Sequence, residues 1–124
     1  MRDTGLANVT TYFYRVAAVN AVGQSEWSTV AQGTTTLAAP TGVSASASSS
    51  PPPAVTVSWT EVQGAAGYEV ARSDGPAFDP ASAVLVAATG STTTDSTVTT
   101  NGTYTYAVRA VTLVGTTTVR STWV

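Results

Sequence analysis

A strand-like phrase occurs twice in this chain of 124 residues, and its second copy lies 92 positions after the first (104 − 12). The first copy is TYFYRVAAVN, from Thr11 to Asn20, and the second is TYTYAVRAVT, from Thr103 to Thr112. In both copies apolar residues recur at every second position, which is the period of a strand with one buried face. A repeat of this length exceeds the units of solenoid proteins and is typical of tandem whole domains.

Each copy runs on to a glycine and then to a Ser-x-Trp triplet, which ends at Trp27 in the first copy and at Trp123 in the second. The second copy has four more residues between its valine and its tryptophan, Val111 to Trp123 against Val19 to Trp27. We interpret both copies as hairpins and expect the second to have the longer loop, from Thr112 to Val119.

The segment between the copies predicts further short strands separated by turns. Pro40 and Gly42 mark a joint, and the run Ser48 to Pro53 must be a loop because proline lacks the N–H donor of a sheet interior. Strands are expected from Val43 and over 55–59, 68–70, 84–87 and 92–99, with a proline-bearing connection at 74–80. Six or seven short strands without a convincing helix predict an antiparallel β-sandwich.

Composition excludes several classes of function. Apolar residues make up 43% of the chain, enough for a packed core, and the net charge is −2. All five basic residues are arginines spread along the chain, so the clustered positive charge of a nucleic-acid-binding protein is missing. No apolar run approaches the length that crosses a bilayer. With no histidine, cysteine or lysine, the usual general bases, thiolates and Schiff-base amines are absent, so we expect no enzyme and no cofactor.

Several motifs taken together resemble a fibronectin type III domain. In the second part of the chain they are Pro40-x-Gly42-Val43, Val55-x-Val57-x-Trp59, Gly67-Tyr68-x-Val70 and Val98-x5-Tyr104-x-Tyr106-x-Val108-x-Ala110-Val111. The first copy adds Leu6-x5-Tyr12-x-Tyr14-x-Val16-x-Ala18-Val19-Asn20, followed by Gly23-x-Ser25. Together these motifs occur in the expected order and cover almost the whole chain. The resemblance implies an immunoglobulin-like antiparallel β-sandwich. It also implies a tyrosine corner, in which Tyr104, and Tyr12 in the first copy, hydrogen-bonds back to upstream backbone.

The same resemblance divides the chain. Residues 38–124 are expected to form one nearly complete domain, and residues 1–37 to be the C-terminal strands of a preceding domain plus the joint. A two-stranded hairpin is marginal alone and exposes an edge. We therefore expect the chain to be a fragment of a longer protein. The alternative is that the hairpin pairs with the incomplete second domain, in the same molecule or in a strand-complemented dimer.

Candidate chemical sites are sparse. Gly23-Gln24-Ser25 looks like the start of a nucleophile elbow but has no base to serve it, and we interpret it as a hairpin turn. Glu61 and Glu69 flank a glycine-rich turn, and a glycosidase needs only two carboxylates, but solvated outward positions explain them. The segment from Asp74 to Asp79 offers two carboxylates without the alternating ligands of a calcium loop, so no metal site is expected.

Trp27 and Trp123 are the residues that could contact a ligand, because aromatic faces stack on sugar rings. The simpler interpretation is that each covers the edge of a core. We expect a non-catalytic spacer or accessory module of a larger, secreted bacterial multidomain protein, such as a polysaccharide-degrading enzyme. Such a module is extracellular or at the cell surface, with the adjacent domains as its partners. The alternatives are a weak carbohydrate-binding or adhesion module and a structural module of a phage tail or surface protein.

Overall fold

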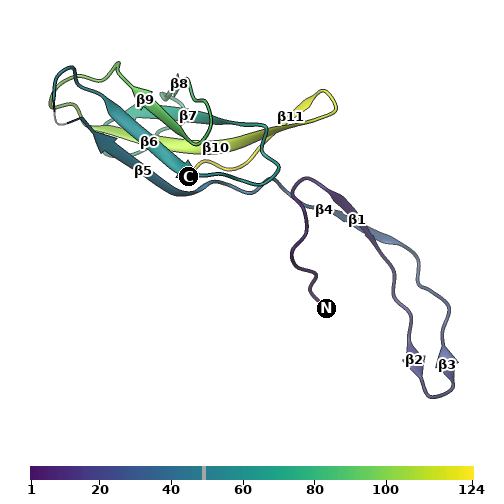
Figure 1. Cartoon of the computed structure of the whole chain (residues 1–124). Coiled ribbons are helices and arrows are strands. Elements are labelled where there is room, and N and C mark those ends of the chain that lie inside the picture. Colours follow the sequence, from purple (N-terminus) through teal and green to yellow (C-terminus); the bar gives the residue numbers. More distant parts are fainter. Residues whose placement is uncertain (49) are drawn as a thin grey trace. The chain divides into compact units, whose positions relative to one another are not determined.

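The computed structural model of the chain describes residues 1–48 and 50–124, and all of its regular structure is β. Its internal contacts divide the chain into two compact units, Met1–Thr36 and Leu37–Val124 (Figure 1). The two units differ in kind, because the second is a layered sandwich and the first is a ribbon. Each is therefore described by itself.

The second unit consists of two antiparallel sheets. One has the strand order β5-β6-β9 and the other has the order β11-β10-β7-β8 (Figure 1). Every pairing within them is antiparallel. The strands are β5 (Thr41–Ala47), β6 (Val55–Thr60), β7 (Gly67–Asp74), β8 (Val84–Val86), β9 (Thr92–Asp95), β10 (Tyr104–Val114) and β11 (Thr117–Arg120). The expected antiparallel β-sandwich is confirmed.

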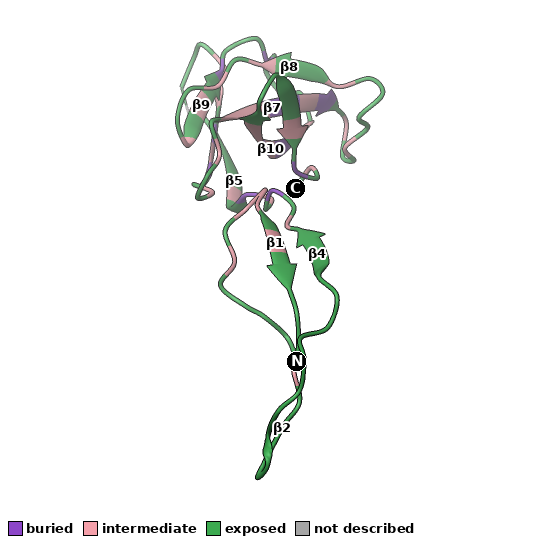
Figure 2. Cartoon of the chain, turned by 90° about the vertical axis from the view of Figure 1, so that its right-hand side faces the viewer, coloured by how far each residue is buried: buried purple, intermediate pink, exposed green. Residues whose placement is uncertain are grey.

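The core of this unit lies between the two sheets. Val57 and Trp59 enter it from β6, Val70 from β7 and Val108 from β10. The Trp59 and Tyr68 rings meet with centroids 5.3 Å apart at a tilt of 59°, a favourable arrangement for aromatic pairs. All buried residues of the described chain belong to this unit (Figure 2). The alternation predicted for these strands therefore gives the correct inward faces.

The predicted threonine-rich strand is shorter than expected. We expected it to cover 92–99, but β9 ends at Asp95. The Asp95 carboxylate accepts hydrogen bonds from the backbone N–H and the hydroxyl of Thr97, and this local turn replaces further ladder pairing. In the predicted loop from Ser48 to Pro53, Ser49 lies outside the described residues, and the others lie outside strands.

The prediction of a longer second hairpin loop is wrong. Strands β10 and β11 pair directly from Val111–Arg120 to Val114–Thr117, so only two residues form the turn. The hairpin of the first copy also has a two-residue turn, between Asn20 and Gly23. Gly115 has a φ of 61° at the first turn position, as in the two-residue turns that favour glycine there. The four extra residues therefore lengthen the strands, and the hairpin tip projects beyond the sandwich (Figure 1).

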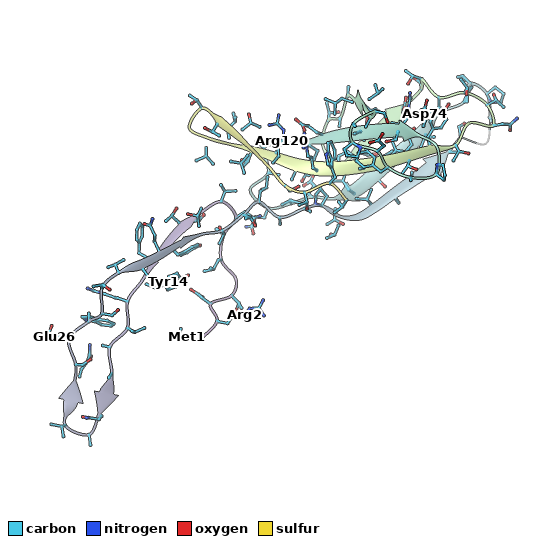
Figure 3. The ribbon with its side chains drawn as sticks, turned by 180° about the vertical axis from the view of Figure 1, so that it is seen from behind. Met1, Arg2, Tyr14, Glu26, Asp74 and Arg120 are labelled. Atoms are coloured by element: carbon cyan, nitrogen blue, oxygen red, sulfur yellow. The ribbon has the colours of Figure 1, made fainter. Side chains whose placement is uncertain are left out.

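The first unit is a twisted antiparallel ribbon. Strand β1 (Thr11–Tyr14) pairs with β4 (Ala31–Thr34), and β2 (Val19–Asn20) pairs with β3 (Gly23–Gln24) at the far end. Its side chains stand out on both faces, and Tyr14 and Glu26 are labelled in Figure 3. The face that corresponds to the core is open, because Val16 is 70% exposed whereas Val108, its counterpart 92 positions later, is fully buried.

The two hairpins repeat one another bond by bond. The backbone N–H of Ser25 donates to the carbonyl of Ala18 at 2.9 Å, and Ser121 donates to Ala110 at 3.0 Å. In return, each alanine N–H donates to the serine Oγ, at 2.9 Å in the first copy and 3.0 Å in the second. The sequence repeat is therefore a repeat of backbone geometry.

Both predicted tyrosine corners are confirmed. The hydroxyl of Tyr104 accepts a hydrogen bond from the backbone N–H of Thr99 at 2.9 Å, five residues upstream. The hydroxyl of Tyr12 accepts the equivalent bond from Ala7, also at 2.9 Å.

Candidate functional site

Trp123 packs on the outer face of the four-stranded sheet. The guanidinium of Arg109 lies over its ring at 4.1 Å from the centroid, and the Phe78 ring is 5.7 Å away at 56°. The outward-facing Ala71 and Ala107, which pair across β7 and β10, are buried. These contacts fit the interpretation that Trp123 packs against its own unit, because Arg109 and Phe78 already cover part of its ring.

Trp27 has a more open environment. Its side chain is 51% exposed, and the guanidinium of Arg15 lies 4.8 Å from its ring centroid. Each tryptophan therefore makes a cation–π contact with an arginine of its own hairpin, but the two side chains differ in burial. Each tryptophan makes its contacts within its own unit, and the side chain of Trp27 is the more exposed of the two.

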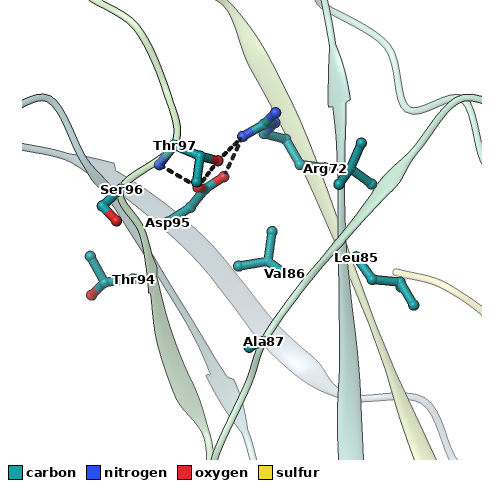
Figure 4. A pocket seen from close by; sticks show the side chains of 9 residues that line it. Arg72, Leu85, Val86, Ala87, Thr94, Asp95, Ser96 and Thr97 are labelled. Carbon is teal, nitrogen blue, oxygen red and sulfur yellow. Dashed lines mark hydrogen bonds and ion pairs between the residues drawn. The ribbon is translucent and has the colours of Figure 1, made fainter.

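A charged cluster links the two sheets inside the second unit. Arg72 on β7 donates from Nη1 to Oδ2 of Asp95 on β9 at 2.8 Å and to the hydroxyl of Thr97 at 2.7 Å (Figure 4). The hydroxyl of Tyr106 on β10 donates to the same carboxylate oxygen at 3.1 Å. The cluster borders a hollow of about 270 Å³ that opens between β8 and β9.

These contacts decide the ionisation of the cluster. Burial opposes the charged form of Asp95, but the hydrogen bonds from Thr97, Arg72 and Tyr106 outweigh it and lower its pKa to about 2. The bond to Asp95 raises the pKa of Arg72, while burial and the same carboxylate raise the pKa of Tyr106. The hollow is therefore bordered by a cation and an anion that neutralise each other, as in a structural ion pair.

Two of the carboxylates considered at the sequence level, Glu69 and Asp79, have hydrogen-bond partners, whereas Glu61 is exposed. Glu69 accepts hydrogen bonds from Arg109 and Arg120, and the bond from Arg120 in particular holds its pKa below the usual range. A carboxylate held ionised in this way cannot serve as the general acid of a glycosidase at neutral pH. Asp79 accepts bonds from the Ala81 N–H and the Ser82 hydroxyl, which lower its pKa.

The remaining candidates also have structural explanations. The Ser25 hydroxyl accepts the Ala18 N–H and donates to the carbonyl of Glu26, so its hydrogen-bonding capacity is used by the hairpin. No group of three or more acidic, histidine or cysteine side chains that could hold a metal lies within residues 1–48 and 50–124. The same residues contain no helix long and apolar enough to cross a membrane.

Sequence reasoning missed the partners of both Trp123 and Asp95. The sequence contains a signal for the partners of Asp95, because Arg72 follows the core residue Val70 by two positions on the same strand. A charged residue at an inward position needs a buried partner of opposite charge. No comparable signal announces the contact of Phe78 with Trp123, because Phe78 lies in an irregular connection and reaches the sheet only through the tertiary fold.

Comparison with known proteins identifies a structural likeness only. No protein-family model matches the sequence, and no curated protein matches it. The chain is similar to the crystal structure of the chicken CNTN1 FN1–FN3 domains, with 26% sequence identity and a TM-score of 0.46. The match covers 89% of this chain and 38% of that one, so the chain spans well under half of that structure.

The fold class of the second unit follows from its own strand order and core. A three-stranded sheet packs on a four-stranded sheet, with the core tryptophan on β6 and the tyrosine corner at the start of β10. These are the features that the resemblance of the sequence implied. Residues 37–124 therefore form a fibronectin type III-like β-sandwich.

Proposed function

We propose that this chain is a non-catalytic spacer or accessory module from a tandem array of fibronectin type III domains in a larger multidomain protein. The observation that carries the proposal is the repeated hairpin, whose serine–alanine hydrogen bonds and tyrosine corner recur in both units. In this interpretation residues 1–37 are the last strands of a preceding domain plus a short joint.

The location of the parent protein is part of the proposal. Modules with this fold commonly occur outside cells, and the composition, with arginine as the only basic residue and many alanines and threonines, favours a bacterial source. We infer a secreted or cell-surface protein, such as a polysaccharide-degrading enzyme. A short joint between sandwiches would hold the neighbouring domains at a fixed separation.

An antibody raised against residues 37–124 tests this proposal in the source cells. We expect it to detect a polypeptide far larger than 12.5 kDa in the medium or at the cell surface. A cytosolic band of about 12.5 kDa would contradict both the tandem array and the secreted location.

A carbohydrate-binding role is the second candidate, and the exposure of Trp27 is the observation in its favour. Retention of the whole chain on an insoluble polysaccharide, such as crystalline cellulose, separates the two roles. Under the spacer proposal the wild-type chain passes through unretained. Trp123→Ala then lowers the stability of the second unit, because the Phe78 and Arg109 contacts are lost.

The matched variant Trp27→Ala gives the opposite signature if the chain binds sugars. Binding predicts that the wild type is retained, and that Trp27→Ala abolishes retention without changing the melting temperature. That pair of results would replace the spacer proposal with the carbohydrate-binding one.

A further inference from the structure

The turn before β10 contains an asparagine followed by a glycine. Asn101 and Gly102 are both exposed, and Asn101 has a φ of 60°. In an Asn-Gly pair the backbone nitrogen of the glycine can attack the side-chain carbonyl of the asparagine, because glycine has no side chain to obstruct the approach. The other asparagines of the chain, Asn8 and Asn20, are followed by a valine and an alanine. Asn101 is therefore the asparagine whose own sequence most favours this ring closure.

The reaction of such a pair requires water as its only co-reactant. The Gly102 nitrogen loses its proton and bonds to Cγ of Asn101, and the side-chain nitrogen leaves as ammonia, so that a cyclic succinimide forms. Water then opens the ring at one of its carbonyl groups. One product is aspartate with a normal main chain. The other is isoaspartate, whose main chain runs through Cγ and is one methylene longer.

The folded turn holds the reacting groups apart. The Gly102 N–H donates to the carbonyl of Thr99 at 3.2 Å, so these residues form the two ends of a four-residue turn. The positive φ of Asn101 at the third position is typical of a type II turn, in which the third residue has a ψ of about 0°. At this ψ the Gly102 nitrogen is rotated away from Cβ of Asn101, whereas ring closure needs the two nearly eclipsed about the Cα–C bond. The proton that the nitrogen must lose is also bonded to Thr99.

The side chain of Tyr104 fastens this turn at both ends. Its hydroxyl accepts a hydrogen bond from the Thr99 N–H at 2.9 Å, and it lies 3.0 Å from the Thr99 hydroxyl oxygen. Its ring lies against Gly102, since a Cβ on that residue would be 2.5 Å from ring atoms. Opening of the tyrosine corner therefore releases the Gly102 nitrogen and lets Asn101 rotate into the reactive geometry.

We propose that Asn101 is a deamidation site that the tyrosine corner keeps closed. The site reacts in molecules whose corner has opened, so the rate of modification follows the open population. Both products replace a neutral amide by a carboxylate and add one negative charge to a net charge of −2. In isoaspartate the extra methylene lies inside the turn, so the bond between Gly102 and Thr99 does not re-form in its original geometry. Modification therefore makes the opening of the corner permanent in that fraction of the chains.

Trypsin makes each asparagine separately measurable, because it cleaves after arginine and the chain has no lysine. The asparagines fall on different peptides, with Asn8 on 3–15, Asn20 on 16–72 and Asn101 on 73–109. Mass spectrometry of these peptides, after incubation of the whole chain at mildly alkaline pH, follows the conversion of amide to acid. We expect conversion on peptide 73–109 and not on the other two. It should be more than about tenfold faster in guanidinium chloride than in the folded chain, because opening the corner costs free energy.

The variant Tyr104→Phe tests whether the corner controls the rate. Loss of the hydroxyl removes the bond from Thr99, and the loss of one such bond shifts an opening equilibrium about fivefold. Deamidation of Asn101 in the folded variant should therefore be about fivefold faster than in the wild type. Val86→Ala is the control, because it weakens the core from β8 and leaves the corner intact. It should not change the rate at Asn101.

Three results would overturn the proposal. The first is a folded wild type in which Asn101 deamidates as fast as in guanidinium chloride, since the corner then gives no protection. The second is an unfolded chain in which peptide 73–109 keeps its amide. The third is an equal rise in rate in Tyr104→Phe and Val86→Ala, which would assign the reaction to global unfolding. The comparison of folded and unfolded wild type uses no substitution, so it remains decisive even where a variant folds poorly.

Discussion

Asp95 shows how a single residue joins the two sheets of the sandwich. Its carboxylate is almost fully buried, and it receives hydrogen bonds from Thr97, Arg72 and Tyr106. These partners come from its own turn, from β7 and from β10. The side chain therefore fixes the end of β9 against the opposite sheet.

The depressed pKa of Asp95 predicts how stability depends on pH. Its folded pKa of about 2 lies below the ordinary value of 3.8, so the ionised form stabilises the fold above about pH 4. This contribution, about 2 kcal/mol, is lost as the pH falls from about 4 towards 2. Urea unfolding of the wild type and of Asp95→Asn should show a stability difference that shrinks over this window. A difference that stays constant down to pH 2 would contradict the assigned pKa.

Val9 and Asn101 occupy the same place before the two tyrosine corners, and both have positive φ, 51° and 60°. Asparagine tolerates this left-handed conformation, whereas a β-branched side chain is strained there by roughly 1–2 kcal/mol. We expect Val9→Asn to stabilise the first unit by about 1 kcal/mol, measured as slower hydrogen exchange of the Ala7 amide. The converse change, Asn101→Val, should destabilise the second unit in urea. Faster exchange in Val9→Asn would refute the comparison.

At the scale of elements, the tyrosine corner joins Thr99, in the connection after β9, to the start of β10. The Tyr104 ring leans over Gly102, where a Cβ would lie 2.5 Å from ring atoms. The Arg72 guanidinium lies 5.0 Å from the centroid of the same ring. The corner thus depends on a hydroxyl, on a glycine and on a cation from a different strand.

Two substitutions at this corner give a prediction that exposure alone would not. Gly102 is exposed, and replacing an exposed glycine by alanine often stabilises a protein. Here Gly102→Ala should destabilise the second unit, because the new methyl group meets the Tyr104 ring. Tyr104→Phe should cost about 1 kcal/mol through loss of the bond from Thr99. Urea unfolding followed by tryptophan fluorescence measures both, and a neutral or stabilising Gly102→Ala would count against this packing.

At the scale of the whole molecule, the two units should differ in local stability. The second unit has a closed core between two sheets, whereas the ribbon of the first unit has no second layer among its own residues. In dilute solution we expect the amides of β1 and β4 to exchange rapidly and those of β6, β7 and β10 to exchange only on global unfolding. Hydrogen exchange read by mass spectrometry checks this, with the β10 amides as the internal reference. Strong protection of the ribbon in a dilute monomer would contradict the description of the first unit as an open hairpin.

The sequence by itself determined the class of fold and the inward faces of most strands. Alternation with a period of two is a local property of an extended chain, so it places Val57, Val70 and Val108 on buried faces without any knowledge of long-range contacts. The tyrosine corners were predicted from the family resemblance, and each bond spans only five residues. The repeat of 92 positions likewise predicted that the two hairpins would share their geometry.

Only the tertiary structure decided the rest. Which strand pairs with which depends on contacts between residues far apart in the chain, so the strand orders of the two sheets could not be derived from alternation. The pairing of Arg72 with Asp95 and of Trp123 with Phe78 arises from packing between separate elements. The length of the second hairpin loop was also mispredicted, because ladder hydrogen bonds extend a hairpin as far as its turn allows. Local periodicity identifies which face of a strand is buried, and long-range packing determines what lies against it.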